Sequence, residues 1–183
     1  MFEELLVRHC SPTLAGIKTG NLFACSFACI ENMRSAVRKV NSFFVKKGLR
    51  VLPLRFQDNK ALIYVYRPSK LLLDLKHNIS SRLLRKSSYK TDSPKRCIVY
   101  LIHRIASSRD FPHEIGLFLR YPPEDVCGFI ENKAENWKCA GLWKVYGDAE
   151  VAKRLFEQYK KCTECYCALF AKGRSIKQLA VAV

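Results

Sequence analysis

Hydrophobic residues recur at intervals of three and four along four stretches of the chain. These stretches lie within residues 30–48, 68–83, 94–107 and 148–170. The spacing places the apolar side chains on one face of an α-helix, so each stretch is predicted to be helical. Gly48 is expected to end the first helix, because glycine readily adopts the backbone conformation that terminates helices. The last stretch starts with an aspartate that is expected to cap its helix.

The N-terminal stretch is interpreted as two short helical segments. Residues 2–9 are expected to hold one or two helical turns. A second helix is expected to start at Ser11-Pro12, because serine is a good N-cap and proline suits the first helical position. Cys10 would then lie just before a helix N-terminus.

Runs rich in β-branched and aromatic residues predict strands at residues 21–27, 49–56 and 61–67. The last two runs are separated by a short polar segment and are therefore expected to form a hairpin. Pro53 has no amide donor, so its strand is expected at the edge of the sheet. Residues 138–146 are predicted to form a further strand.

Three shorter segments complete the pattern. Residues 114–119 fit either a buried strand or a short helix, since a brief apolar run has no decisive period. Residues 122–130 are expected to form a short helix with acidic residues at its positive end. Residues 175–183 fit a last strand or helix.

The mixture of helices with hairpins favours an α+β fold over a doubly wound parallel sheet. We expect a single domain, 1–183, with a mixed or antiparallel sheet and several packed helices. Within it we distinguish a basic helix–hairpin–helix region, 30–107, from a C-terminal half, 110–183, that bears most of the candidate site. The length of 183 residues and the hydrophobic share of 49% agree with a globular chain.

Two features bear on the location of the protein. The longest apolar run, Cys97–Ile102, is far shorter than the about 20 residues that a membrane helix needs. The start of the chain lacks the basic and long apolar segments of a secretory signal. Together with nine cysteines, an odd number, this favours a cytoplasmic protein whose thiols stay reduced.

The net charge of +16 is distributed unevenly. Residues 34–109 contain nineteen basic and three acidic residues, whereas the two flanking parts are each close to neutral. This concentration of positive charge indicates a polyanionic partner such as nucleic acid, an anionic lipid surface or a phosphate-rich ligand. The alternative is a basic surface that only aids solubility.

Cys10, His113 and Glu114 are candidates for nucleophilic chemistry. At a helix N-terminus, free amides and the helix dipole would lower the pKa of the Cys10 thiol. His113 lies in a loop where it could act as the base, and Glu114 beside it could orient the imidazole. The alternative is that the cysteine is a small buried residue and that the other two side chains satisfy loop amides.

Two lysines are candidates to hold an anion. Lys18 lies in a glycine-bracketed loop, residues 16–20, whose backbone amides could wrap an anion. Lys144 lies between aromatic residues on the strand 138–146, with Tyr146 on the same face. The alternative for Lys144 is a strand residue whose stem covers apolar surface while its ammonium stays in water.

Cys162, Cys165 and Cys167 raise the question of a metal site. A structural zinc site needs four nitrogen or sulfur ligands, and no second CxxC pair occurs in the chain. On the helix predicted here, the first two cysteines share a face and the third points away. We therefore assign no metal ligands and interpret these residues as small apolar side chains along a helix.

Several longer blocks of the sequence resemble one bacterial family. They include His9–Lys18, Phe111–Leu119, Tyr121–Val126 and Trp143–Asp148, and through them the chain is similar nearly end to end to domain-of-unknown-function family 3793. The resemblance implies a cytosolic protein of anaerobic bacteria with one domain and no established activity. The residues typical of the family, in the numbering of this chain, are Cys10, Thr13, Lys18, His113, Glu114, Gly116, Cys139, Lys144 and Tyr146. Arg120 departs from the family pattern, in which a glycine is expected.

The leading hypothesis is a thiol-dependent function on a small anionic ligand. Cys10 would be the nucleophile or redox thiol, His113 the base and Glu114 the orienting group. The ligand would be held by Thr13, Lys18, Lys144 and Tyr146. Whether the protein is an enzyme, which cofactor it uses and its oligomeric state are left open.

Two alternatives belong to other functional classes. The first is a non-enzymatic protein that binds nucleic acid or another polyanion. Its contacts would be Arg34, Arg38, Lys39, Lys46, Lys47, Arg82, Arg85 and Lys86. The second is a metal-linked scaffold that uses the cysteines.

Overall fold

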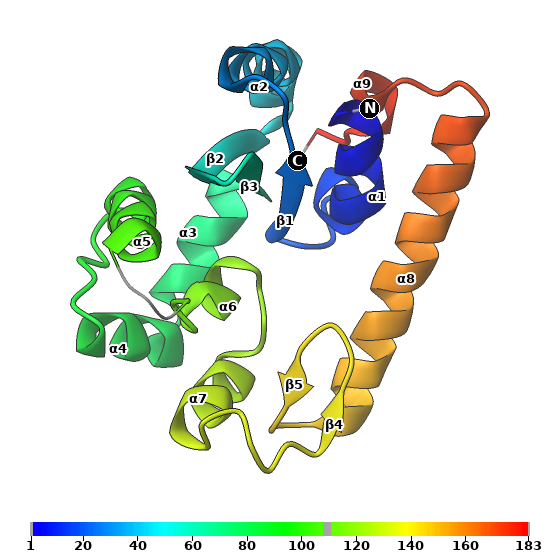
Figure 1. Ribbon diagram of the computed structural model, residues 1–183. Coiled ribbons are helices and arrows are strands. Elements are labelled where there is room, and N and C mark those ends of the chain that lie inside the picture. The colour runs from blue at the N-terminus through cyan, green and yellow to red at the C-terminus, as the bar shows by residue number, and fades with distance from the viewer. Residues whose placement is uncertain (1, 108–110, 183) are drawn as a thin grey trace. The chain divides into compact units, whose positions relative to one another are not determined.

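The computed structural model describes residues 2–107 and 111–182. The chain forms two compact units, unit 1 (Met1–Ser69 and Lys161–Val183) and unit 2 (Lys70–Lys160). The helices and antiparallel strands confirm the predicted α+β class (Figure 1). The two regions distinguished in the sequence, 30–107 and 110–183, do not coincide with these units, because unit 1 combines both ends of the chain.

Unit 1 is built on a three-stranded antiparallel sheet. Its strands are β1 (Gly20–Ser26), β2 (Arg50–Gln57) and β3 (Lys60–Tyr66), in the order β1-β3-β2. β2 therefore lies at the edge of the sheet, as Pro53 predicted, and its register shifts between Pro53 and Arg55. The shift keeps the proline, which has no amide donor, out of a continuous ladder.

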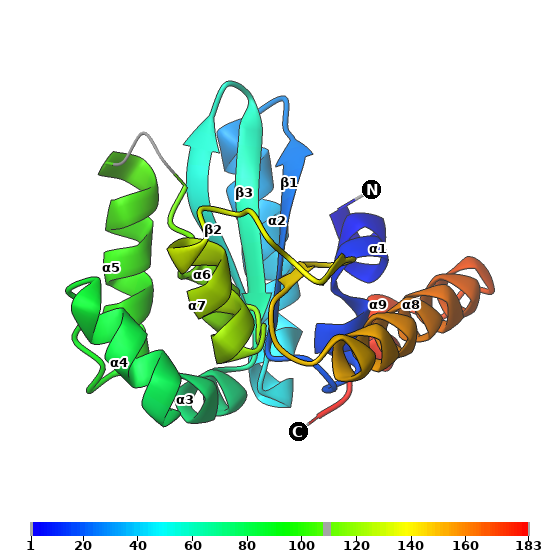
Figure 2. The same ribbon diagram turned by 90° about the horizontal axis from the view of Figure 1, so that it is seen from below.

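Helices cover one face of this sheet. α2 (Ile30–Phe44) runs along the sheet and continues as a 3-10 turn, η1 (Val45–Lys47) (Figure 2). Gly48 follows with a φ of 72°, which confirms the predicted end of the helix. The buried side chains of α2 pack with those of α1 (Phe2–Leu14) and the short α9 (Ile176–Leu179) on the inward side chains of the strands. The resulting apolar core is the main stabilising feature of unit 1.

The N-terminal segment is one helix, so the predicted new start at Ser11 is wrong. α1 continues through Pro12, which lies in its last turn. The Ser11 hydroxyl donates back to the Val7 carbonyl instead of capping a new helix. Pro12 has no amide to donate within the helix, and its carbonyl accepts from Ile17 and Lys18 as the helix ends.

Arg67 joins four segments of unit 1. Its side chain is fully buried, and Nε donates to the Thr13 carbonyl at 2.8 Å. Nη2 donates to the carbonyls of Leu14 at 2.8 Å and Val181 at 2.9 Å, and Nη1 to that of Lys47 at 3.3 Å. The guanidinium therefore satisfies the C-terminal carbonyls of α1 and holds the end of the chain.

Unit 2 contains most of the remaining helices and one small hairpin. Its elements are α3 (Pro68–Lys76), α4 (Asn78–Lys86), α5 (Pro94–Ser107), α6 (Ile115–Phe118), α7 (Pro123–Glu131), β4 (Cys139–Ala140), β5 (Lys144–Val145) and α8 (Ala149–Ala171). α3 starts and α8 ends in unit 1. The segment 114–119, open between strand and helix, forms α6, and the C-terminal segment forms α9.

Two predicted elements are each divided in the structure. The helix expected from Pro68 to Leu83 breaks at His77, whose φ of −56° and ψ of 137° are extended. The break changes the buried face from Leu71 and Leu75 in α3 to Ser80 and Leu84 in α4. Residues 138–146 form a hairpin instead of a single strand. Asp148 accepts hydrogen bonds from the amides of the first turn of α8, which confirms its predicted cap.

Within the described residues, no helix combines the length and the apolar character needed to cross a membrane. The long helix α8 carries charged and polar residues along much of its length. This finding agrees with the short apolar runs of the sequence.

Candidate functional site

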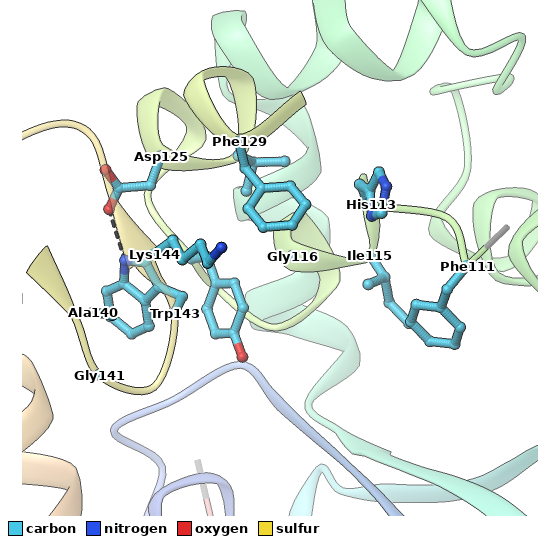
Figure 3. A pocket seen from close by; sticks show the side chains of 12 residues that line it. Phe111, His113, Ile115, Gly116, Asp125, Phe129, Ala140, Gly141, Trp143 and Lys144 are labelled. Atoms are coloured by element: carbon cyan, nitrogen blue, oxygen red, sulfur yellow. Dashed lines mark hydrogen bonds between the residues drawn. The ribbon is translucent and has the colours of Figure 1, made fainter. Parts of the chain in front are cut away.

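Unit 2 encloses a pocket of about 410 Å³ between α6, α7 and the β4–β5 hairpin (Figure 3). Its walls are rich in aromatic rings and include two of the predicted site residues. The lining residues are Phe111, His113, Ile115, Gly116, Tyr121, Asp125, Val126, Phe129, Ala140, Gly141, Trp143 and Lys144. A concave, largely apolar pocket with a few polar groups is the usual form of a small-molecule site.

Asp125 fixes the hairpin against α7. Its carboxylate is buried and accepts from Trp143 Nε1 at 2.7 Å, from the Tyr146 amide at 2.8 Å and from the Gly147 amide at 2.7 Å. Three N–H donors surround one carboxylate, so its negative charge is satisfied by the protein. Asp125 is therefore a positioning residue, and the indole of Trp143 becomes a fixed part of the pocket wall.

Two glycines allow aromatic rings to approach the backbone around the hairpin. A Cβ at Gly128 would overlap the ring of Tyr146, and a Cβ at Gly141 would overlap the ring of Phe156. The first contact packs the hairpin on α7 and the second packs it on α8. Residue 141 can therefore only be a glycine without a shift of its neighbours, since Phe156 occupies the space that a side chain would need.

Lys144 carries the positive charge of the pocket. Its Nζ donates to the Ala134 carbonyl at 2.8 Å and lies 3.9 Å from the ring centroid of Trp137 and 6.0 Å from that of Phe129. In Figure 3 the side chain extends toward the Phe129 ring. Among the residues with described positions, no carboxylate forms an ion pair with Lys144. Its ammonium is therefore held by rings and one carbonyl, and can donate further hydrogen bonds to a ligand.

His113 lies on the opposite side of the pocket in Figure 3. Its ring makes an edge contact with Phe129 at a centroid distance of 5.0 Å and is exposed. In the described part of the chain the imidazole has no hydrogen-bond partner. It can therefore donate to, or accept from, a bound molecule.

Glu114 is engaged elsewhere. Its Oε1 accepts from the Tyr89 hydroxyl at 3.0 Å and pairs with Arg104 Nε at 3.2 Å, and its side chain is buried. Burial, together with the neighbouring carboxylate of Glu114, raises the pKa of Tyr89. These contacts tie α5 to the segment before α6, and the geometry gives no support to the predicted role of Glu114 in orienting His113.

Cys10, Thr13 and Lys18 lie in unit 1. Cys10 belongs to the apolar core, and burial raises the pKa of its thiol, although the nearby Lys18 ammonium opposes this. The predicted lowering of the thiol pKa is wrong, because Cys10 lies inside α1 and not before its N-terminus. Burial lowers the pKa of Lys18 to about 8, and Thr13 donates to Asn21 Oδ1 at 2.7 Å. The nucleophilic role of Cys10 stays a prediction.

The burial of Cys10 leads to a testable expectation. In the native protein, iodoacetamide should modify Cys10 at least about 100-fold more slowly than Cys29 or Cys165, because a buried thiol reacts only after local opening. Cys29 and Cys165 are exposed and serve as internal standards in the same sample. Peptide mass spectrometry over time gives all three rates, and equal rates would restore the sequence prediction of a reactive thiol at position 10.

The remaining candidates are placed as follows. Tyr146 lies outside the lining of the pocket, and its buried hydroxyl has no partner among the described residues. Cys162, Cys165 and Cys167 lie along α8, and within the described ranges no three histidine, cysteine, aspartate or glutamate side chains gather as a metal site.

The eight basic residues of the polyanion alternative are divided between the units. Arg34, Arg38, Lys39 and Lys46 are exposed on α2 and η1 of unit 1, and Arg82, Arg85 and Lys86 are exposed on α4 of unit 2. Lys47 differs from these residues, because its Nζ donates to the carbonyls of Lys177 and Ala180, each at 2.6 Å. Lys47 thus caps α9 rather than offering a free charge.

Sequence reasoning found His113 and Lys144 but missed the rings around them. Phe129 and Trp137 were not singled out, and Asp125 was interpreted only as an acid that favours a helix N-terminus. A local signal existed in the spacing of Trp143-Lys144-Val145-Tyr146, which placed aromatic residues beside a lysine. The partners from α7 carry no such signal, because they approach through tertiary packing.

One comparison with known proteins gives a match. The model of the family described as "Protein of unknown function (DUF3793)" matches residues 6–180, which is nearly the whole chain. No curated protein and no solved structure matches the chain. The candidate site therefore has to be interpreted from its own geometry.

Proposed function

We propose that this chain, which belongs to the DUF3793 family as its sequence blocks predicted, binds a small planar anion such as an aromatic carboxylate in the pocket of unit 2. The observation that carries the proposal is an aromatic wall with the ammonium of Lys144, which forms no ion pair with a carboxylate in the described ranges. A planar ring would lie against the rings of the wall, and its carboxylate would meet the ammonium.

The polar groups of the pocket support an anion rather than a cation. Among the described residues, Asp125 is the one carboxylate in the lining, and three N–H groups already use its oxygens. Lys144 retains donor capacity beyond its bond to the Ala134 carbonyl, since an ammonium carries three N–H groups. His113 adds a second donor on the far wall. We assign to His113 any proton transfer that a bound ligand requires.

The thiol of Cys10 is not part of this proposal. It is fully buried in the core of unit 1, whereas His113 and Lys144 line a pocket of unit 2. A binding site that rests on Lys144 and the rings needs no contribution from the thiol. The thiol hypothesis is therefore tested separately by the alkylation rates described above.

Replacing Lys144 with methionine tests the proposal. The probe is 4-hydroxybenzoate, and its neutral amide serves as the isosteric reference. We expect the substitution to weaken binding of the carboxylate about tenfold or more, because a hydrogen bond to a charged group contributes about 1.5–3 kcal/mol. The affinity for the amide should fall by less than about threefold. Intrinsic fluorescence can report binding, since Trp143 lines the pocket and the only other tryptophan, Trp137, contacts Lys144.

Lys138→Met is the matched control. Lys138 lies beside the same hairpin, is exposed, and donates to the Gly147 carbonyl at 2.7 Å outside the pocket lining. The Lys138→Met substitution removes the same charge from the same part of the chain, and it should change the affinity for the carboxylate by no more than about twofold. Equal affinities for the carboxylate and the amide, or equal losses in the two variants, would refute an anion site at Lys144.

A further inference from the structure

A second hollow of unit 2 lies along the outer face of α5. It has a volume of about 770 Å³ and shares no lining residue with the aromatic pocket. We call it the α5 hollow, defined by Ser88, Lys90, Lys95, Arg96, Val99, Tyr100 and His103. The opposite face of α5 is the buried one, formed by Cys97, Ile98, Leu101 and Ile105.

Positive charge dominates the α5 hollow. Lys90, Lys95 and Arg96 line it, and none of its described lining residues is acidic. Arg96 pairs with Asp92 at 2.7 Å, but both side chains are more than half exposed, so the pair adds little stability and can exchange for another anion. A smaller adjoining hollow shares Lys90 and is also lined by Arg85 and Asp92, so its two basic residues outnumber its one acidic residue.

Aromatic rings lie among these charges. The rings of Tyr100 and His103 are nearly parallel, with an interplanar angle of 20° and a centroid distance of 6.5 Å. Tyr100 is held from the inner side by the buried Tyr89, whose ring lies 4.6 Å away in an edge contact. Val99 is 67% exposed beside them and offers an open apolar surface. The lining of the α5 hollow thus combines basic side chains with the rings of Tyr100 and His103 and the apolar surface of Val99.

We propose that the α5 hollow binds single-stranded nucleic acid, with Lys90, Lys95 and Arg96 on phosphates and the rings of Tyr100 and His103 against bases. Cations that follow the backbone and rings that stack on bases are the two elements of sequence-tolerant single-strand binding. A membrane-surface helix would instead need several large apolar side chains on its outer face. Among the described residues, α5 has one exposed large hydrophobic side chain, Val99.

The salt dependence of binding gives a quantitative test. Three phosphate contacts on a single strand predict a slope of about −2 for log affinity against log salt, and therefore an about 20-fold loss between 50 and 200 mM KCl. The probe is a fluorescein-labelled 12-nucleotide oligo(U), measured by fluorescence anisotropy with the full chain. An affinity that does not change with salt, or the absence of binding at 50 mM, would overturn the proposal.

Charge reversal assigns the binding to this surface. Lys95→Glu with Arg96→Glu removes two of the three contacts, so the affinity at 50 mM should fall at least about 50-fold and the slope should flatten to about −0.7. Lys172→Glu with Arg174→Glu is the matched control, since both residues are exposed just after α8 in unit 1, belong to no candidate site, and change the net charge equally. This control should reduce the affinity for oligo(U) by less than about threefold. Equal losses in the two double variants would show that net charge alone causes binding.

Two further measurements separate the proposed ligand from other anions. Tyr100→Leu should weaken oligo(U) binding at least about fivefold without changing the salt slope, because stacking is not an ionic contact. Vesicles with 30% phosphatidylserine should bind no better than neutral vesicles. Binding to the anionic vesicles without binding to oligo(U) would identify a lipid surface as the partner and refute the proposal.

Discussion

Replacing Arg67 with alanine is expected to reduce the free energy of unfolding by at least about 4 kcal/mol. The guanidinium is fully buried and donates four hydrogen bonds to backbone carbonyls. Hydrogen bonds that involve a charged group contribute about 1.5–3 kcal/mol each. Alanine would remove all four bonds, although the Thr13 and Leu14 carbonyls would still accept from the Gly16 and Val181 amides, and it would leave a cavity of nearly the volume of an arginine side chain.

The position of Arg67 explains why the effect is large. Thr13 and Leu14 lie at the C-terminal end of α1, where the helix dipole favours a cation. The same side chain bonds to the carbonyls of Lys47 and Val181, which lie far apart in sequence. Arg67 therefore connects α1, η1 and the C-terminal segment of unit 1 through one planar group with several donors.

Urea denaturation followed by circular dichroism measures this effect. Arg67→Lys keeps the charge but not the planar guanidinium. Its free energy of unfolding should therefore fall by at least about half as much as that of the alanine variant, and the protein should remain folded enough to measure. Arg55→Ala is the control, since Arg55 is exposed on β2 of the same sheet and should cost less than about 0.5 kcal/mol. A loss below about 1 kcal/mol for Arg67→Ala would contradict the structural role assigned to its hydrogen bonds.

The parts of the fold that the sequence predicted correctly are those with a local repeating pattern. The helices at 30–44 and 94–107 and the hairpin of β2 and β3 follow directly from the spacing of apolar residues. Pro53 indicated the edge strand because a missing amide donor excludes a central position. In each case the residues that determine the element lie within the element.

The errors share a different cause. The start predicted at Ser11 relied on capping propensity, but α1 is stabilised through Pro12 by its burial in the core of unit 1. The residues around His77 include no glycine or proline, so the sequence gives no signal that the helix breaks there. Gly141 packs directly against the Phe156 ring, which comes from another element. Tertiary packing determines the structure at these positions, and the spacing of apolar residues in the sequence gives no sign of it.

The candidate site shows the same division. His113 and Lys144 were found because histidine and lysine are chemically distinctive wherever they stand. Phe129 was not, because an aromatic residue on a predicted helix is ordinarily a core residue. Asp125 was placed correctly at the start of α7, but its role depends on Trp143, which is 18 residues away in the chain. Only the folded unit shows that the Asp125 carboxylate already accepts three hydrogen bonds and that the Lys144 ammonium still has N–H groups to donate.

Asp125→Asn is expected to cost about 3 kcal/mol and to disturb the pocket, although the side chain keeps its shape. The asparagine oxygen can accept from the amides of Tyr146 and Gly147, but its NH₂ group then faces the N–H of Trp143. Two buried donors would remain without acceptors, and the surviving bonds would lose the carboxylate charge that strengthens them. The indole would lose its fixed position on the pocket wall.

Two readouts separate this effect from a general loss of stability. Urea denaturation gives the cost in free energy, and the tryptophan emission of the folded variant should shift to longer wavelength as the indole of Trp143 gains access to water. Asp148→Asn is the matched control, because Asp148 also accepts from two backbone amides, at 2.9 and 3.0 Å, but on an exposed helix cap where asparagine serves nearly as well. It should cost less than about 0.5 kcal/mol and leave the emission unchanged. If both variants lost the same stability, the three donors around Asp125 would not hold the hairpin, and the aromatic wall would need another support.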